Sequence, residues 1–180
     1  MPTRAVLDAC VLVPISLCDV LLELSDVGLY EPLWSEPILK ETRRSLMNKL
    51  SISETKADHR IQLMRAGVPT AMVSGFDDLI DSMGNDPKDR HVLAVAVHMK
   101  CPLIVTANLT DFPDPALSPY GVKAIHPDEF LCELFDDDEQ AVWEAIDHKR
   151  SLYRKPPLTM AEVGQSLTKT VPRFAARLIS

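Results

Sequence analysis

Short apolar runs that alternate with segments of helical periodicity constrain the fold of this chain most strongly. Residues 5–7 and 103–106 are too short for helices; Asp8 follows the first run, and Asn108 stands two residues after the second. Such runs indicate strands buried on both faces, as in a parallel sheet. Strands or extended segments are predicted at 5–7, 29–34, 71–73, 103–106 and 122–125, and helices between them at 11–27, 35–50, 53–66, 76–83 and 89–100. This alternation predicts an α/β fold with a central, mostly parallel sheet.

The pattern changes after Pro127, where only helical segments follow. Helices are predicted at 128–136, 138–153, 159–169 and 172–179. We therefore expect an α/β domain over 1–135 and a basic helical C-terminal extension over 136–180.

Charge divides the chain in a similar way. Residues 1–146 hold 12 Lys and Arg against 24 Asp and Glu, a net of −12, whereas residues 147–180 hold 7 against 2, a net of +5. An acidic body repels a phosphate backbone unless cations intervene. The basic tail either attracts phosphates or only solvates helix faces, and both readings stay open.

Cysteine spacing and hydropathy exclude several classes of protein. The four cysteines are scattered without a C-x-x-C pair, which argues against a disulfide framework and a structural zinc site. The N-terminal apolar run is too short for a signal peptide, and no apolar stretch has the length of a membrane span. A cytoplasmic protein without a membrane partner is the expectation.

Acidic residues stand where elements of the predicted sheet begin or end. Asp8 follows the first strand, Asp111 follows the strand at 103–106, and Asp89 begins a buried helix. Glu41 lies two turns inside the helix that starts near residue 35. Sites of parallel sheets gather at the carboxyl ends of the strands, so these acids are expected to meet.

Clustered carboxylates point to a divalent cation. Without one they repel each other and raise each other's pKa values. Magnesium and manganese prefer hard oxygen ligands, and such ions can polarise a phosphodiester. The pattern therefore predicts a metal site suited to phosphodiester chemistry.

The order of these four acids and of the segments around them resembles the PIN-domain superfamily, especially the bacterial branch that includes VapC-like toxins of toxin–antitoxin pairs. The resemblance covers roughly residues 3–135 and implies a PIN-like three-layer sandwich. It is carried by residues 6–8, 34–41, 86–96 and 104–113, and residues 126–131 resemble the stretch that closes the core in this branch.

By this resemblance, Asp8, Glu41, Asp89 and Asp111 ligate Mg²⁺ or Mn²⁺ and are the catalytic residues. The implied activity is endonucleolytic hydrolysis of single-stranded or structured RNA, by the toxin of a toxin–antitoxin pair. An antitoxin encoded nearby and a homodimer are the implied protein partners. One departure is Asn108, which stands where many PIN proteins carry an Asp, so that Asp111 supplies the fourth carboxylate.

Supporting roles are expected for several neighbours of the acids. Ser35 and Thr106 carry hydroxyls near the pocket, although a helix cap and a strand-end hydrogen bond explain them equally well. Asn108 can offer an amide oxygen to the site, and Asp86 is either a peripheral ligand or the former of the turn before Pro87.

Basic residues near the acids are candidates for binding substrate phosphates. Arg43 and Arg44 follow Glu41 on one helix, and Arg90 follows Asp89. His91 is interpreted as a helix-face residue rather than a general base.

Other classes of protein fit less well. A haloacid-dehalogenase-type phosphatase needs a second Asp two residues after the strand-end Asp, where this chain has Cys10, and a response-regulator receiver needs an early pair of acids. A PIN scaffold that binds RNA or a protein without cutting remains the alternative. The C-terminal helices are expected to extend the RNA surface, mediate homodimerisation or receive an antitoxin.

Overall fold

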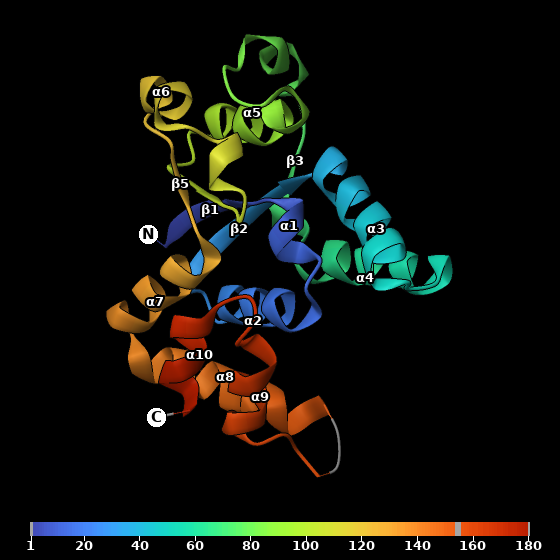
Figure 1. Ribbon diagram of the computed structural model, residues 1–180, viewed down its shortest axis with the longest axis vertical. Helices are drawn as coiled ribbons and strands as arrows, with labels where there is room; N and C mark the ends of the chain where they lie inside the picture. Colours follow the sequence, from blue (N-terminus) through green and yellow to red (C-terminus); the bar gives the residue numbers. More distant parts are fainter. Residues whose placement is uncertain (1, 154–155, 180) are drawn as a thin grey trace.

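The computed structural model describes residues 2–153 and 156–179 and contains a parallel sheet of five strands (Figure 1). The strands are β1 (Thr3–Leu7), β2 (Tyr30–Ser35), β3 (Met72–Val73), β4 (Leu103–Val105) and β5 (Lys123–Ile125). They lie in the order β3-β2-β1-β4-β5, and each neighbouring pair is parallel. Ala5 in the central strand pairs with Pro32 of β2 and Leu103 of β4. The predicted α/β class and the parallel sheet are confirmed.

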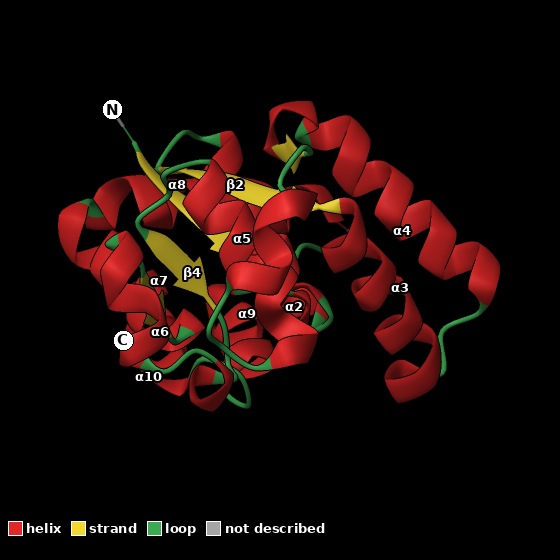
Figure 2. Cartoon of the chain, turned by 90° about the horizontal axis from the view of Figure 1, so that it is seen from above, coloured by secondary structure: helices red, strands yellow, loops and turns green. Residues whose placement is uncertain are grey.

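Helices cover both faces of the sheet, which gives the expected three layers (Figures 1 and 2). The α-helices are α1 (Ala9–Leu12), α2 (Ile15–Asp26), α3 (Glu36–Leu50), α4 (Glu54–Gly67), α5 (Arg90–His98), α6 (Asp114–Leu117), α7 (Pro127–Asp137), α8 (Glu139–Tyr153), α9 (Met160–Leu167) and α10 (Pro172–Ile179). The 3-10 helices are η1 (Pro69–Ala71), η2 (Asp77–Ser82), η3 (Pro87–Asp89), η4 (Leu109–Asp111) and η5 (Ser118–Tyr120).

The order of the strands creates a switch point between β1 and β4. From β1 the chain moves outward through β2 to β3, and then returns to β4 on the other side of β1. Right-handed crossovers place the connections of the two directions on opposite faces, with α2 on one face and α5 and α6 on the other (Figure 1). Ligand sites of open α/β sheets lie outside the carboxyl ends of the strands at such a point.

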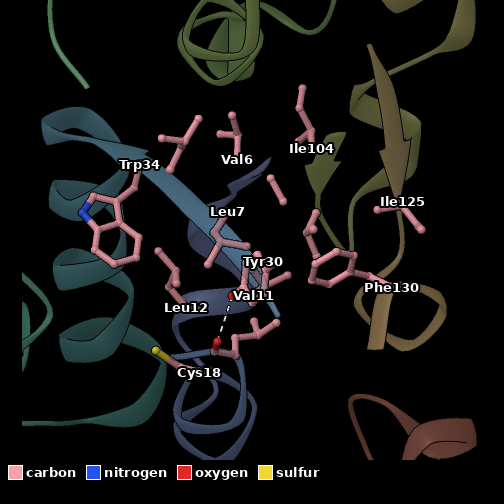
Figure 3. Close-up of a cluster of buried hydrophobic side chains, with 14 of the residues drawn as sticks. Val6, Leu7, Val11, Leu12, Cys18, Tyr30, Trp34, Ile104, Ile125 and Phe130 are labelled. Atoms are coloured by element: carbon pink, nitrogen blue, oxygen red, sulfur yellow. Dashed lines mark hydrogen bonds between the residues drawn. The ribbon is translucent and has the colours of Figure 1, made fainter. Parts of the chain in front are cut away.

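The core beneath the sheet joins the strands to α2 and α7 (Figure 3). The Tyr30 hydroxyl, fully enclosed, donates a hydrogen bond to the Leu21 carbonyl at 2.9 Å. The ring of Phe130 from α7 meets the Tyr30 ring edge to face, with 5.0 Å between centroids. Residue 130 therefore lies in the core, as the resemblance over 126–131 implies.

The C-terminal helices pack against the same core. Leu167 of α9 and Phe174 of α10 belong to one cluster of buried side chains with the strands. Asp128 of α7 accepts hydrogen bonds from the backbone N–H groups of Arg173 and Phe174 at the start of α10, at 3.2 and 2.9 Å. The four helices predicted after Pro127 are present, and the predicted boundary between residues 135 and 136 falls inside α7. That division of the chain stays a prediction. The basic tail includes Arg154 and Lys155, which lie outside the described residues.

Two predicted helices differ from the structure. The segment predicted as one helix over 11–27 is divided into α1 and α2, because Pro14 lacks an N–H and adopts an extended conformation with ψ of 117°. The helix predicted over 76–83 is the 3-10 helix η2, none of whose residues is buried. In η2, only Leu79 and Ile80 pack against the core, and both are half-buried, so little apolar burial favours a regular α-helix here.

Within the described ranges, no helix combines the length and the apolar character needed to cross a membrane.

Candidate active site

Asp8 lies at the carboxyl end of β1, beside the residues that follow β4. Its backbone N–H donates to the Val105 carbonyl at 3.1 Å, which extends the pairing of the two strands. The buried Thr106 hydroxyl donates to Asp8 Oδ2 at 2.7 Å, and the Cys10 thiol donates to the same oxygen at 3.1 Å. The Asp8 carboxylate is almost fully buried, and these two donors fix its orientation.

Asp89 enters the same region from the loop that precedes α5. Asp86 shapes this loop, because its Oδ1 accepts from the Lys88 N–H at 3.1 Å. The Asp86 N–H donates to the Asp111 carbonyl at 3.2 Å, which ties the loop to the one after β4. Asp89 is 8% exposed, and its Oδ2 accepts no hydrogen bond from the described residues. Burial, followed by the charges of Asp8 and Asp111, raises the pKa of Asp89 to about 7.

Glu41 reaches the site from α3, opposite the start of α5. Its Oε1 lies 3.2 Å from Nε2 of His91, which is 8% exposed. One ligand atom from each of Glu41, Asp89 and His91 lies within 4.8 Å of the other two. The helix that carries Glu41 and the helix that begins at Arg90 thus converge on Asp89.

Lys88 brings a positive charge to the exposed side of the acids. Its Nζ lies 3.2 Å from Asp111 Oδ2 and 3.9 Å from Asp89 Oδ2. The hydrogen bond to Asp111, together with the charges of Asp111, Asp86 and Asp89, raises the pKa of Lys88. Its side chain is 66% exposed, so it can leave the acids at little cost.

The donor set fits a divalent cation. The charges of Asp8 and Asp111 act on Asp89, and the ligand atoms that lie within 4.8 Å of one another belong to Glu41, Asp89 and His91. The buried Asp89 Oδ2 has no hydrogen-bond donor among the residues that the structure describes. A buried carboxylate oxygen without a hydrogen bond is costly even with Lys88 Nζ 3.9 Å away, and a hard cation would satisfy it.

Comparison with known families matches residues 4–110 to the PIN domain. The chain belongs to the PIN-domain family. Residues 127–179, from the first residue of α7 onward, match the VapC50 C-terminal domain. Among curated proteins, the chain is 46% identical over 111 residues to the putative ribonuclease VapC50 of Mycobacterium tuberculosis. That match covers 62% of this chain and 66% of the relative, just under two thirds of its length. No solved structure matches the chain.

In this PIN domain, the predicted supporting residues occupy different surroundings. Thr106 holds Asp8 and also accepts from the Asn108 N–H at 3.0 Å, whereas the Asn108 side chain is exposed. Asp86 forms the turn before α5, which was one of its two expected roles. Ser35 stands at the N-cap position of α3 without a side-chain cap, and its buried Oγ has no partner among the described residues.

The three arginines predicted to bind substrate differ in their contacts and exposure. Arg43 binds Asp58 and Glu54 of α4, and its hydrogen bond to Asp58 contributes most to raising its pKa. The Arg43 guanidinium therefore joins α3 to α4, and its expected role at the substrate stays a prediction. Arg44, the next residue, is exposed. Arg90 is half-buried beside Asp89, and its Nε has no hydrogen-bond partner in the described ranges.

Cys10 is a site residue that the sequence interpretation missed. Its Sγ accepts from the Ala107 N–H at 3.2 Å and lies 3.4 Å from the Thr106 hydroxyl, in addition to its bond to Asp8. Burial, followed by the charge of Asp8, raises the pKa of the Cys10 thiol to about 12, so it remains a protonated donor. The only sequence signal for Cys10 was its position two residues after Asp8. His91 stands at the same spacing, two residues after Asp89.

Proposed function

We propose that this chain is a Mg²⁺- or Mn²⁺-dependent endoribonuclease, acting on single-stranded or structured RNA as the toxin of a toxin–antitoxin pair. The observation that carries the proposal is the cluster of Glu41, Asp89 and His91 within 4.8 Å, in which the buried Asp89 Oδ2 has no hydrogen bond among the described residues and feels the charges of Asp8 and Asp111. The PIN-domain match and the likeness to a putative ribonuclease support the same conclusion.

In this proposal, Asp8, Glu41, Asp89 and Asp111 hold the cation. A bound divalent ion polarises the phosphodiester and neutralises the charge that develops on its oxygens during hydrolysis. Thr106 and Cys10 orient the Asp8 carboxylate, because both donate to its Oδ2. The arrangement needs no nucleophilic side chain, since the chain has only to position water and substrate around the acids.

Substrate phosphates are assigned to the basic groups at the rim of the site. Lys88 is exposed and close to Asp111, Arg44 is exposed on the helix of Glu41, and Arg90 lies beside Asp89. The body of the chain is strongly acidic, so these cations and the bound metal offset its repulsion of RNA.

The remaining partners are proposed from the relative and from the C-terminal region. The likeness to VapC50 supports an antitoxin as the natural inhibitor, and residues 136–180 are assigned to contacts with that partner, with RNA or with a second copy. Because α10 is capped by Asp128 and shares the core, this region also stabilises the nuclease fold.

The test is cleavage of a labelled RNA in Mg²⁺ or Mn²⁺ by the full chain and by Asp8→Asn. Asp77→Asn is the matched control, because Asp77 is exposed on η2. We expect cleavage by wild type and the control, and a loss of about 10²-fold or more in Asp8→Asn. Equal cleavage by all three proteins contradicts a metal-dependent nuclease. RNA binding without cleavage by wild type favours the non-cleaving scaffold.

A further inference from the structure

His91 occupies a place that the four acids do not account for. We propose that His91 is itself a metal ligand through Nε2, so that the site has a mixed nitrogen and oxygen ligand set. This proposal rests on the proposed function, because the same acids hold the ion. His91 begins the first turn of α5 with Arg90, and its imidazole is turned toward Glu41 of α3 rather than toward solvent.

The distances suit ligands of one ion. Adjacent ligands of an octahedral ion lie about 3 Å apart and opposite ligands about 4.2 Å apart, for metal–ligand bonds of about 2.1 Å. His91 Nε2 and Glu41 Oε1 are 3.2 Å apart, close to the separation of adjacent ligands. One ligand atom each from Glu41, Asp89 and His91 falls within 4.8 Å, so a small movement of one side chain brings all three to a common ion.

Two unsatisfied atoms indicate that the cluster is built for a ligand. Asp89 Oδ2 and His91 Nδ1 are both buried and have no hydrogen-bond partner among residues 2–153 and 156–179. A histidine kept only for structure normally has both ring nitrogens satisfied when it is buried. Here Nδ1 has no partner among the described residues and Nε2 lies 3.2 Å from Glu41 Oε1, so Nε2 is the nitrogen that faces the acids.

A nitrogen ligand affects which metal the site prefers. Magnesium strongly favours an all-oxygen environment, whereas first-row transition ions accept imidazole readily. A site with His91 as a ligand therefore discriminates in favour of Mn²⁺ over Mg²⁺, and loss of the imidazole reduces that discrimination.

The experiment is pulsed electron paramagnetic resonance on the full-length protein loaded with Mn²⁺ alone, together with Mn²⁺ affinity and its competition by Mg²⁺. We compare wild type with His91→Gln, whose amide can still donate to Glu41, and with His98→Gln as the matched control. His98 lies on the same helix and is exposed. Thermal melting shows that each variant is folded.

We expect an imidazole ¹⁴N coupling to Mn²⁺ in wild type and His98→Gln that is absent in His91→Gln. The Mn²⁺ affinity of His91→Gln should fall about tenfold, and its Mg²⁺ affinity should fall less. Absence of the coupling in wild type, or its persistence in His91→Gln, overturns the proposal. Asp89→Asn separates this failure from that of the proposed function. If Asp89→Asn binds Mn²⁺ more weakly but wild type shows no nitrogen coupling, the acids hold the ion and only the role of His91 as a ligand is rejected. If Asp89→Asn binds Mn²⁺ as tightly as wild type, the acidic metal site is rejected as well.

Discussion

Asp89 and Asp128 are both buried aspartates near the start of a helix, and their surroundings are opposite. Asp128 is 6% exposed and accepts two backbone hydrogen bonds at the N-terminus of α10. Asp89 is 8% exposed at the N-cap position of α5, yet its side chain makes no cap hydrogen bond. Its neighbours include the like charges of Asp8 and Asp111.

This difference distinguishes an aspartate that stabilises the fold, Asp128, from one that serves the proposed function, Asp89. A carboxylate that receives N–H groups at a helix N-terminus is stabilised by them and by the helix dipole. A buried carboxylate among other carboxylates costs stability, which is the usual signature of a functional position. The C-terminal helices therefore strengthen the fold, while the carboxyl end of the sheet keeps an electrostatic cost that the proposed cation would remove.

The largest expected effect comes from Asp89→Asn. We expect RNA cleavage to fall about 10³-fold, because one ligand loses its charge. In metal-free buffer the melting temperature should be unchanged or higher, since a repelled charge is removed. Single-turnover cleavage and thermal melting in EDTA measure the two effects. If Asp89→Asn loses much stability as well as activity, Asp89 stabilises the fold as Asp128 does, and the contrast between the two residues is wrong.

The converse result is expected for Asp128→Ala. The N–H groups of Arg173 and Phe174 lose their acceptor, which should cost about 2 kcal/mol of unfolding free energy. The melting temperature should drop by roughly 4–8 °C. Cleavage per folded molecule at low temperature should stay within about twofold of wild type. Asp137→Ala, an exposed site at the end of the same helix, is the control, and an equal loss there contradicts the capping role.

A smaller effect should appear in the pH dependence of metal-free protein. The pKa of Asp89 is raised from 3.8 to about 7 on folding, so the folded state binds more protons than the unfolded state between these values. The contribution of Asp89 to the unfolding free energy is therefore favourable at low pH and decreases as pH rises toward 7. Denaturant titrations in EDTA from pH 5 to 8 measure this slope. Asp89→Asn should make it flatter, and an identical slope in both proteins contradicts the unsatisfied state of Asp89.

The smallest expected effect concerns Lys88, which lies near Asp111 and Asp89 and adds a competing positive charge to the site. Lys88→Met should bind Mn²⁺ a few times more tightly, since an exposed ion pair contributes about 0–1 kcal/mol. RNA binding should weaken in the same variant. Calorimetric titration tests this, with Lys123→Met as an exposed control on β5. Weaker Mn²⁺ binding by Lys88→Met is the contrary result.

Much of the site was predictable because its acids stand at the ends of elements. Asp8 and Asp111 follow buried strands, and Asp89 precedes a buried helix, so the parallel topology alone directs them to one edge. The PIN-domain assignment followed from the order and context of these acids, and Glu41 became interpretable only with them. The alternation of elements predicted the sheet in the same way.

What escaped prediction depends on contacts between distant segments. Cys10 meets Thr106 across 96 positions, and His91 meets Glu41 across 50. Arg43 could not be assigned from its own helix, because its partner Asp58 comes from the next one. Side-chain direction across packed elements decides each case, and local periodicity does not encode it. The same holds for Asp128, whose partners belong to α10.

The most direct measurement of the central claim is anomalous diffraction from crystals of the full chain soaked in Mn²⁺. The account predicts an anomalous peak among Asp8, Glu41, Asp89 and Asp111, at about 2.1 Å from Asp89 Oδ2. Mn²⁺ peaks only elsewhere, or none at concentrations that support cleavage, would contradict a metal site built around Asp89.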